Sequence, residues 1–284
     1  MRGQAISVGI GLVSGVLSGA FGIGGGIITT PAIRLLLGAP ALIAVGTPLP
    51  VIFPAAFTGA LTYAREGVAD LRTGLICGLA GTATAVLGAW ATTWAGGETV
   101  LVVTAALVLY TAADVTWQAL RSPRAAPTTA EKPADSDRPP RSATFADPPA
   151  DGVSRASASA VPLVPLMVIG AMTGLYSGFL GLGGGFVLVP LLTRWLGFDV
   201  KRAIATSLVA VTVLAVPGTI AHAFLGNIDW GIAFALMLGV VPGAVLGARL
   251  TLRAGDRTVR LGFAALLLLV GVWLVASELP GLLR

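Results

Sequence analysis

The sequence predicts an all-α polytopic membrane protein with two inverted repeats of about five hydrophobic segments each, eight to ten in total, because one membrane-spanning helix needs about 20 mostly apolar residues. Glycine is expected to break some of the helices. Three observations lead to this fold class: the composition, a glycine cluster that occurs twice, and a polar stretch between the two copies. Of the 284 residues, 55% are apolar and only 11% are charged, with a mean hydropathy of +0.89. A soluble domain of this size carries more charge on its surface.

The glycine cluster reads GVLSGAFGIGGGIITTP from Gly15 to Pro31 and GLYSGFLGLGGGFVLVP from Gly174 to Pro190. The glycines, the serine and the proline of the first copy recur 159 residues later in the second. Glycine destabilises a helix interior, so each cluster is expected to end one helix inside an apolar stretch. Two broken hydrophobic segments at matching positions of two halves are typical of a transporter's binding site.

The hydrophobic segments follow one another in the same order in both halves. They cover residues 5–21, 25–37, 42–64, 71–94 and 99–120, and then 162–180, 184–197, 203–225, 230–250 and 259–277. Pro48 and Pro50 predict a kink or an unwound turn in the third segment, because proline lacks an amide hydrogen and clashes with the preceding turn. Residues 11–89 align with 170–248 without a gap, which indicates an internal duplication. A matching break is therefore expected at Thr206 and Ser207.

The polar stretch covers residues 121–160 and is rich in Pro, Ser, Ala and Thr. With so few large apolar residues it cannot bury enough surface to fold, so we expect a disordered linker. It divides the chain into an N-terminal transmembrane repeat (residues 1–120) and a C-terminal transmembrane repeat (residues 161–284). The apolar start of the chain is expected to be a retained helix and not a signal peptide, because the second half contains its counterpart.

The basic residues predict the topology. If each glycine cluster is the tip of a helical hairpin, either two crossings or a re-entrant pair, only Arg2, Arg34 and Arg284 of the 18 Lys and Arg residues lie opposite the linker. If each cluster lies within one continuous crossing, the basic residues divide almost evenly. The positive-inside rule favours the hairpin, with the linker in the cytoplasm and both termini outside. Five segments per half then make the two halves inverted.

Several functional classes are excluded by what the chain lacks. A single cysteine, Cys77, and a single histidine, His222, leave no disulfide framework and no Cys- or His-based metal site. No catalytic constellation and no cofactor motif are found, and nucleic acid is not an expected partner because the basic residues gather in loops. His222 aligns with Tyr63 near the end of a segment, which favours an interfacial residue over a proton relay. Asp70 and Asp229 are expected to cap the fourth segment of each half.

The chemistry is expected at the glycine clusters. The half-helix after each cluster presents free N–H groups and the positive end of a helix dipole, and glycine lets an anion approach the backbone. For Ser18 and Ser177 helix packing is an equal alternative, and for the glycines before each cluster packing is favoured. The predicted substrate-binding residues are Ser18, Gly24, Gly25, Gly26, Thr47, Tyr176, Ser177, Gly183, Gly184, Gly185, Thr206 and Ser207.

The doubled G-x3-G-x2-G-x-GGG-x4-P pattern and the G-x3-G-A ending from Gly243 to Ala248 resemble the sulfite exporter TauE/SafE family of membrane permeases. The resemblance covers the chain apart from residues 121–160. It implies transport of small sulfur-containing or organic anions, such as sulfite, sulfonates or sulfoacetate, across a bacterial inner membrane. The first half departs from the second at Pro48 and Pro50, where the second has Ser207 and Val209.

The leading hypothesis is therefore a secondary transporter in the bacterial inner membrane, which exports a small anion by alternating access. Its expected partners are the anion and the lipid bilayer. A non-transporting membrane assembly factor is the alternative, but such a protein needs no broken helices. An intramembrane enzyme is a third hypothesis, and it requires a catalytic constellation that the sequence does not contain.

Overall fold

The computed structural model describes residues 2–95, 97–121 and 162–282, and in these residues it contains only α-helices as regular secondary structure. Of the linker predicted for 121–160, only Arg121 is described. The eleven helices are α1 (Arg2–Phe21), α2 (Gly26–Leu36), α3 (Ala41–Gly46), α4 (Pro48–Arg65), α5 (Leu71–Ala95), α6 (Gly97–Arg121), α7 (Leu163–Leu180), α8 (Gly185–Trp195), α9 (Val200–Phe224), α10 (Trp230–Arg253) and α11 (Asp256–Leu282).

The two halves repeat helix by helix, as the sequence predicts. The helices α2, α5 and α6 begin 159 residues before α8, α10 and α11, the same offset as between the glycine clusters. The hydrophobic pattern therefore places nearly every helix, and the ends differ from the predicted ones by only a few residues.

One predicted feature is wrong. A break was expected at Thr206 and Ser207, but α9 continues through both residues. In the first half α3 ends at Gly46 and α4 starts at Pro48, so the predicted interruption is present there. The difference follows from the prolines, since Thr206, Ser207 and the residues around them all keep the amide hydrogens that a continuous helix needs.

Equivalent helices of the two halves run in opposite directions. A Cβ on Gly218 of α9 would lie 3.3 Å from the side chain of Leu49 on α4, and a Cβ on Gly59 of α4 would lie 2.9 Å from that of Leu208 on α9. The early part of one helix therefore faces the late part of the other. This antiparallel contact confirms that the repeats are inverted.

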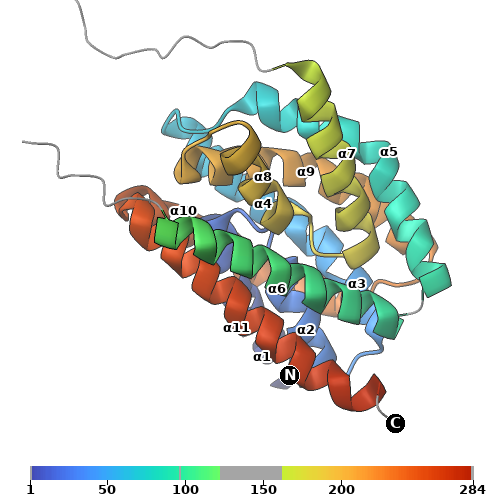
Figure 1. Cartoon of the computed structure of the whole chain (residues 1–284). Coiled ribbons are helices and arrows are strands. Elements are labelled where there is room, and N and C mark those ends of the chain that lie inside the picture. Colours follow the sequence, from blue (N-terminus) through green and yellow to red (C-terminus); the bar gives the residue numbers. More distant parts are fainter. Residues whose placement is uncertain (1, 96, 122–161, 283–284) are drawn as a thin grey trace, which may run out of the picture.

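The first helix of each half packs against a helix of the other half. Helix α1 packs along α10 and α7 packs along α5, and Figure 1 shows α7 beside α5 and α6 beside α11. A Cβ on Gly11, Gly15 or Gly19 would overlap the main chain of Leu236, Val240 or Ala244, respectively. The glycines before the cluster therefore serve packing, as predicted, because they let two backbones approach closely within a membrane.

Within the described residues, six helical segments are long and apolar enough to span a membrane: Gln4–Phe21, Ala41–Arg65, Leu71–Ala95, Leu163–Leu180, Val200–Phe224 and Trp230–Arg253. The helices that follow the glycine clusters are shorter. Both α2 and α8 have 11 residues, which corresponds to about 16 Å, roughly half of the hydrocarbon thickness of a bilayer. Each glycine hairpin therefore combines a long helix with a half-length one.

Asp70 and Asp229 have the capping role that the sequence predicts. The carboxylate of Asp70 accepts a hydrogen bond from the amide of Thr73 at 3.0 Å, and that of Asp229 accepts one from the amide of Ile232 at 3.0 Å. Burial raises the pKa of Asp70, but hydrogen bonds from Thr73 and Arg202 outweigh it, so that the pKa lies below its usual value. The two caps fix where α5 and α10 begin.

Candidate functional site

The glycine clusters form two tips in which the chain reverses between a long helix and a half-helix. In the first tip Gly22, Gly24 and Gly25 have φ angles of 72°, 81° and 86°. Their counterparts in the second tip have φ angles of 66°, 80° and 71°. Only glycine adopts this left-handed conformation at little cost, which explains why the same glycines recur in both halves.

The two tips contact each other. A Cβ on Gly26 would lie 2.7 Å from the Cα of Leu182, and a Cβ on Gly185 would overlap the carbonyl oxygen of Gly22. Gly24 and Gly183 both lie against the side chains of Ile52 and Val211.

The contact lies at mid-height in the bundle. Ile52 is near the middle of the Ala41–Arg65 span and Val211 near the middle of Val200–Phe224. The half-helices α2 and α8 therefore both begin at the centre of the molecule.

The first turn of each half-helix contains backbone amides without acceptors. Gly25, at the N-cap of α2, makes no side-chain cap bond, and the backbone amides that donate to its carbonyl are those of Ile28 and Thr29, both at 3.2 Å. The amides of Gly26 and Ile27 thus have no acceptor among the described residues. The same pattern holds at α8, where the carbonyl of Gly184 accepts from Val187 and Leu188 at 3.1 Å and leaves the amides of Gly185 and Phe186 unpaired.

Hydroxyl groups gather around the same turns. Ser14 donates to the carbonyl of Gly25 at 3.0 Å. In the part of the chain that the structure describes, four buried hydroxyls have no partner, and all lie in or beside the hairpins: Ser18, Thr30, Thr173 and Ser177. A Cβ on Gly184 would lie 2.7 Å from Thr173 and 3.2 Å from Ser177, so these two side chains face the N-cap of α8.

No buried charge accompanies these donors. The buried polar side chains of the described residues are Ser, Thr, His and Asn, with no Lys, Arg, Asp or Glu among them. Leaving a buried polar group unpaired costs about 1–3 kcal/mol, so a cluster of unpaired donors is expected to have a ligand. Backbone amides and hydroxyls at the positive ends of two helices fit an anion.

The structure brings eight of the predicted residues to the tips, sets Ser207 against the first tip, and places the other three elsewhere. Gly24, Gly25, Gly26, Gly183, Gly184 and Gly185 form the tips, with Ser18 and Ser177 beside them. Ser207 donates to the carbonyl of Gly22 at 3.0 Å and to that of Ile204 at 2.8 Å, so its hydrogen is already used. It holds the first tip against α9.

The two predicted threonines tie loops to helices. Thr47 accepts a hydrogen bond from the amide of Asp229 at 3.0 Å, and Thr206 accepts one from the amide of Asp70 at 3.2 Å. These amides precede α10 and α5, so the two bonds are equivalent by the repeat. Neither of these two hydrogen bonds involves a residue of the tips.

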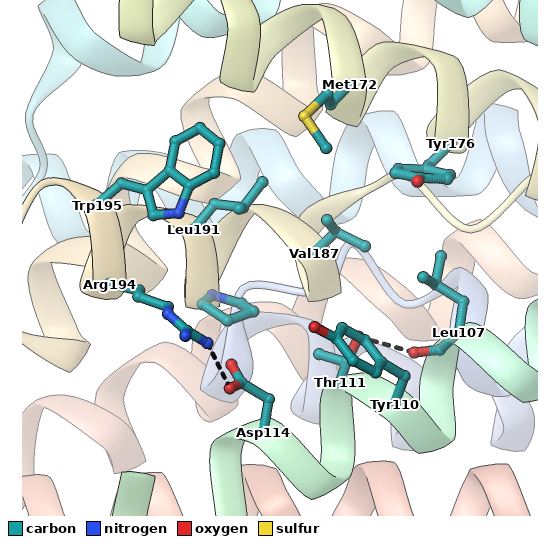
Figure 2. A pocket seen from close by; sticks show the side chains of 11 residues that line it. Leu107, Tyr110, Thr111, Asp114, Met172, Tyr176, Val187, Leu191, Arg194 and Trp195 are labelled. Carbon is teal, nitrogen blue, oxygen red and sulfur yellow. Dashed lines mark hydrogen bonds and ion pairs between the residues drawn. The ribbon is translucent and has the colours of Figure 1, made fainter.

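Tyr176 lines a different feature, a pocket of about 340 Å³ between α6, α7 and α8. Figure 2 shows its ring at one end of this pocket and the ion pair between Arg194 and Asp114 at the other. The pocket lies on the side of α8 that also carries Val187 and Leu191.

Other residues that support the tips were not predicted from the sequence. Thr173 and Ser14 lie one helical turn before Ser177 and Ser18, a spacing that could have indicated them. His222 is fully buried, and its Nε2 lies 3.2 Å from the carbonyl of Gly178, a packing role that the sequence did not indicate. Its counterpart Tyr63 donates to the carbonyl of Gly19 at 3.0 Å in the same way. The two side chains anchor the last turn before each tip.

Comparison with known proteins agrees with this architecture. Residues 7–274 match the family described as sulfite exporter TauE/SafE. The chain belongs to this family. It is therefore a multi-pass membrane transporter.

Two similar proteins cover nearly the whole length of the chain, and a third covers part of it. The probable membrane transporter protein YunE of Bacillus subtilis is 24% identical over 95% of this chain and 96% of its own length. A probable membrane transporter protein of Xylella fastidiosa is 28% identical over 95% of this chain and 94% of its own length. The probable membrane transporter protein MamO of Paramagnetospirillum magneticum is 35% identical over 45% of this chain and 22% of its own length. No solved structure is significantly similar to the chain.

Proposed function

We propose that the chain exports a small sulfur-containing or organic anion, of the sulfite, sulfonate or sulfoacetate class, by alternating access. The observation that carries the proposal is the pairing of two half-helix N-termini at the centre of the bundle, each with unpaired amides and hydroxyls. Such donors recognise an oxyanion through several hydrogen bonds, and they avoid the cost of a permanent positive charge in the membrane.

The anion binds to the amides of the first turns of α2 and α8. Ser18 and Ser177 complete its hydrogen bonds. The anion's own oxygens then satisfy donors that are otherwise unpaired, and this offsets part of its dehydration. Because an oxyanion offers acceptors in several directions, both half-helices contribute to one bound ion.

Alternating access follows from the inverted repeat. The hairpins α1–α2 and α7–α8 enter the bundle from opposite sides, and their tips meet against Ile52 and Val211. Separation of the tips on one side exposes the donors to that side, and the inverted movement exposes them to the other. In each of the two states, Ile52 and Val211 keep water from passing across the membrane.

Anion flux in proteoliposomes that contain the purified full chain tests this function. Preloaded sulfite is expected to leave these vesicles faster than it leaves protein-free vesicles. An assembly factor would give no flux with sulfite, simple sulfonates or sulfoacetate, and this result would overturn the proposal. Release of a chemically altered product would indicate an enzyme instead.

A further inference from the structure

The pocket between α6, α7 and α8 is a groove with two different ends, which we call the α6–α8 groove. Asp114, Arg194 and Trp195 line one end, and Leu107, Met172 and Val187 line the other. The Nη1 atom of Arg194 lies 2.7 Å from Oδ1 of Asp114. Its volume of about 340 Å³ is within the range of small-molecule pockets, about 300–1,000 Å³.

The polar end combines Asp114 from the first half with Arg194 from the second, and the repeat shows that the equivalent positions carry no such pair. By the offset of 159 residues, Asp114 corresponds to Trp273 and Arg194 to Leu35. The equivalent helices α11 and α2 thus carry apolar residues at these positions. Charged side chains are costly within a membrane segment, and the fold evidently does not require them here. The ion pair therefore points to a ligand and not to packing.

The polar end lies where a helix meets the membrane surface. Arg194 and Trp195 are the last two residues of α8, and Trp117 lies one turn beyond Asp114 on α6. Trp195 and Trp117 are both exposed. Exposed tryptophans gather at the level of lipid headgroups, and the apolar end of the groove then points toward the hydrocarbon.

The charges at this end match a headgroup that carries both signs. The guanidinium of Arg194 has five N–H donors, so it can bind a phosphate while it keeps its bond to Asp114. The carboxylate of Asp114 can accept additional hydrogen bonds from an ammonium group. The Arg194 side chain is 60% exposed, and an exposed ion pair is weak, so a ligand shares it at little cost.

We propose that the α6–α8 groove binds phosphatidylethanolamine, with its phosphate on Arg194, its primary ammonium on Asp114 and an acyl chain along Leu107, Met172 and Val187. A route for the transported anion is disfavoured, because Asp114 would repel the anion at the entrance. The proposal is independent of which substrate the protein transports.

Native mass spectrometry of the purified, delipidated full chain tests this assignment. We expect phosphatidylethanolamine to be retained at least about tenfold more strongly than phosphatidylcholine, which lacks ammonium hydrogens, and than phosphatidylglycerol, which lacks the ammonium; this factor corresponds to one hydrogen bond between charged groups. Arg194→Leu, which introduces the residue found at position 35, should weaken retention of all three lipids. Asp114→Asn should remove only the preference for phosphatidylethanolamine.

Arg253→Leu is the control, because Arg253 is an exposed arginine at the end of α10, away from the groove. It should retain phosphatidylethanolamine like the wild type, and thermal unfolding should show that each variant is folded. The proposal would be overturned if the wild type retained the three lipids equally and the Arg194→Leu variant retained them as strongly as the wild type. Preference for phosphatidylglycerol would overturn the headgroup assignment. Tyr110 also lines the groove. Cross-linking of Tyr110→Cys to a second copy in lipid vesicles would show that another protomer covers the groove, and would overturn the proposal as well.

Discussion

Ser18 and Ser177 are the residues on which the proposed site depends most. Both were predicted from the repeated cluster, and both hydroxyls are buried without a partner beside the half-helix N-termini. Thr30 could not be singled out, because a threonine in an apolar helix usually donates to its own backbone, as Thr212 does to Leu208 at 2.7 Å. Only the folded chain shows which hydroxyls lack that bond.

Ser18→Ala and Ser177→Ala should each weaken anion binding. Loss of one hydrogen bond to an ion costs about 1.5–3 kcal/mol, or roughly 10- to 150-fold in affinity. Calorimetric titration of the purified variants with sulfite measures the change. Thr219→Val is a suitable control, because its hydroxyl bonds only to Ala215 within α9, at 2.6 Å. Wild-type affinity in both serine variants would remove the hydroxyls from the site.

Thr206→Val should reduce stability and leave anion affinity nearly unchanged. The substitution removes the acceptor of the Asp70 amide, and an unpaired amide costs about 1–3 kcal/mol. Thermal unfolding compared with Thr212→Val, whose hydroxyl bonds only within its own helix, measures this cost. A loss of affinity at unchanged stability would instead restore the substrate-binding role that the sequence predicted for Thr206.

At the scale of elements, local signals explain most of what could be predicted. Glycine and proline determine where the helices stop, because they change the backbone itself, and the break before Pro48 was predicted correctly. The expected break in α9 was wrong because similarity between the repeats was extended to positions where the prolines are missing. The pairing of α1 with α10 had no local signal, since the two helices lie more than 200 residues apart.

Two glycines of α1 are expected to differ in how well they tolerate a larger side chain, because only one of them packs against α10. Gly15→Ala would place a Cβ against the main chain of Val240, and this overlap should cost about 1–3 kcal/mol. Gly9 has no atom within 4 Å of such a Cβ, so Gly9→Ala should be neutral or stabilising by about 0.5–1 kcal/mol. Thermal unfolding of both variants in detergent is the measurement. Equal stability of the two would show that α1 and α10 are not in close contact.

For the whole molecule, the inverted repeat leads to a prediction about topology. The antiparallel arrangement of α4 and α9 means that the two halves face opposite sides of the membrane. Together with the distribution of basic residues, it predicts that the linker lies in the cytoplasm and that both termini lie outside. Activity reporters fused at positions 124 and 284, both outside the described residues, should therefore report opposite sides. A cytoplasmic C-terminus would contradict the hairpin topology.

The central claim, that backbone amides at the two tips hold the anion, can be tested at the amides themselves. The chain is labelled with 15N at glycine, isoleucine, phenylalanine and arginine, and its spectrum is followed during titration with sulfite. We predict that the amide proton signals of Gly26, Ile27, Gly185 and Phe186 move downfield in a saturable way, because each gains a hydrogen bond to a negative charge. The side-chain signals of Arg34 and Arg194 should stay in place. Saturable shifts of these arginine signals, with the four amides unchanged, would contradict the account.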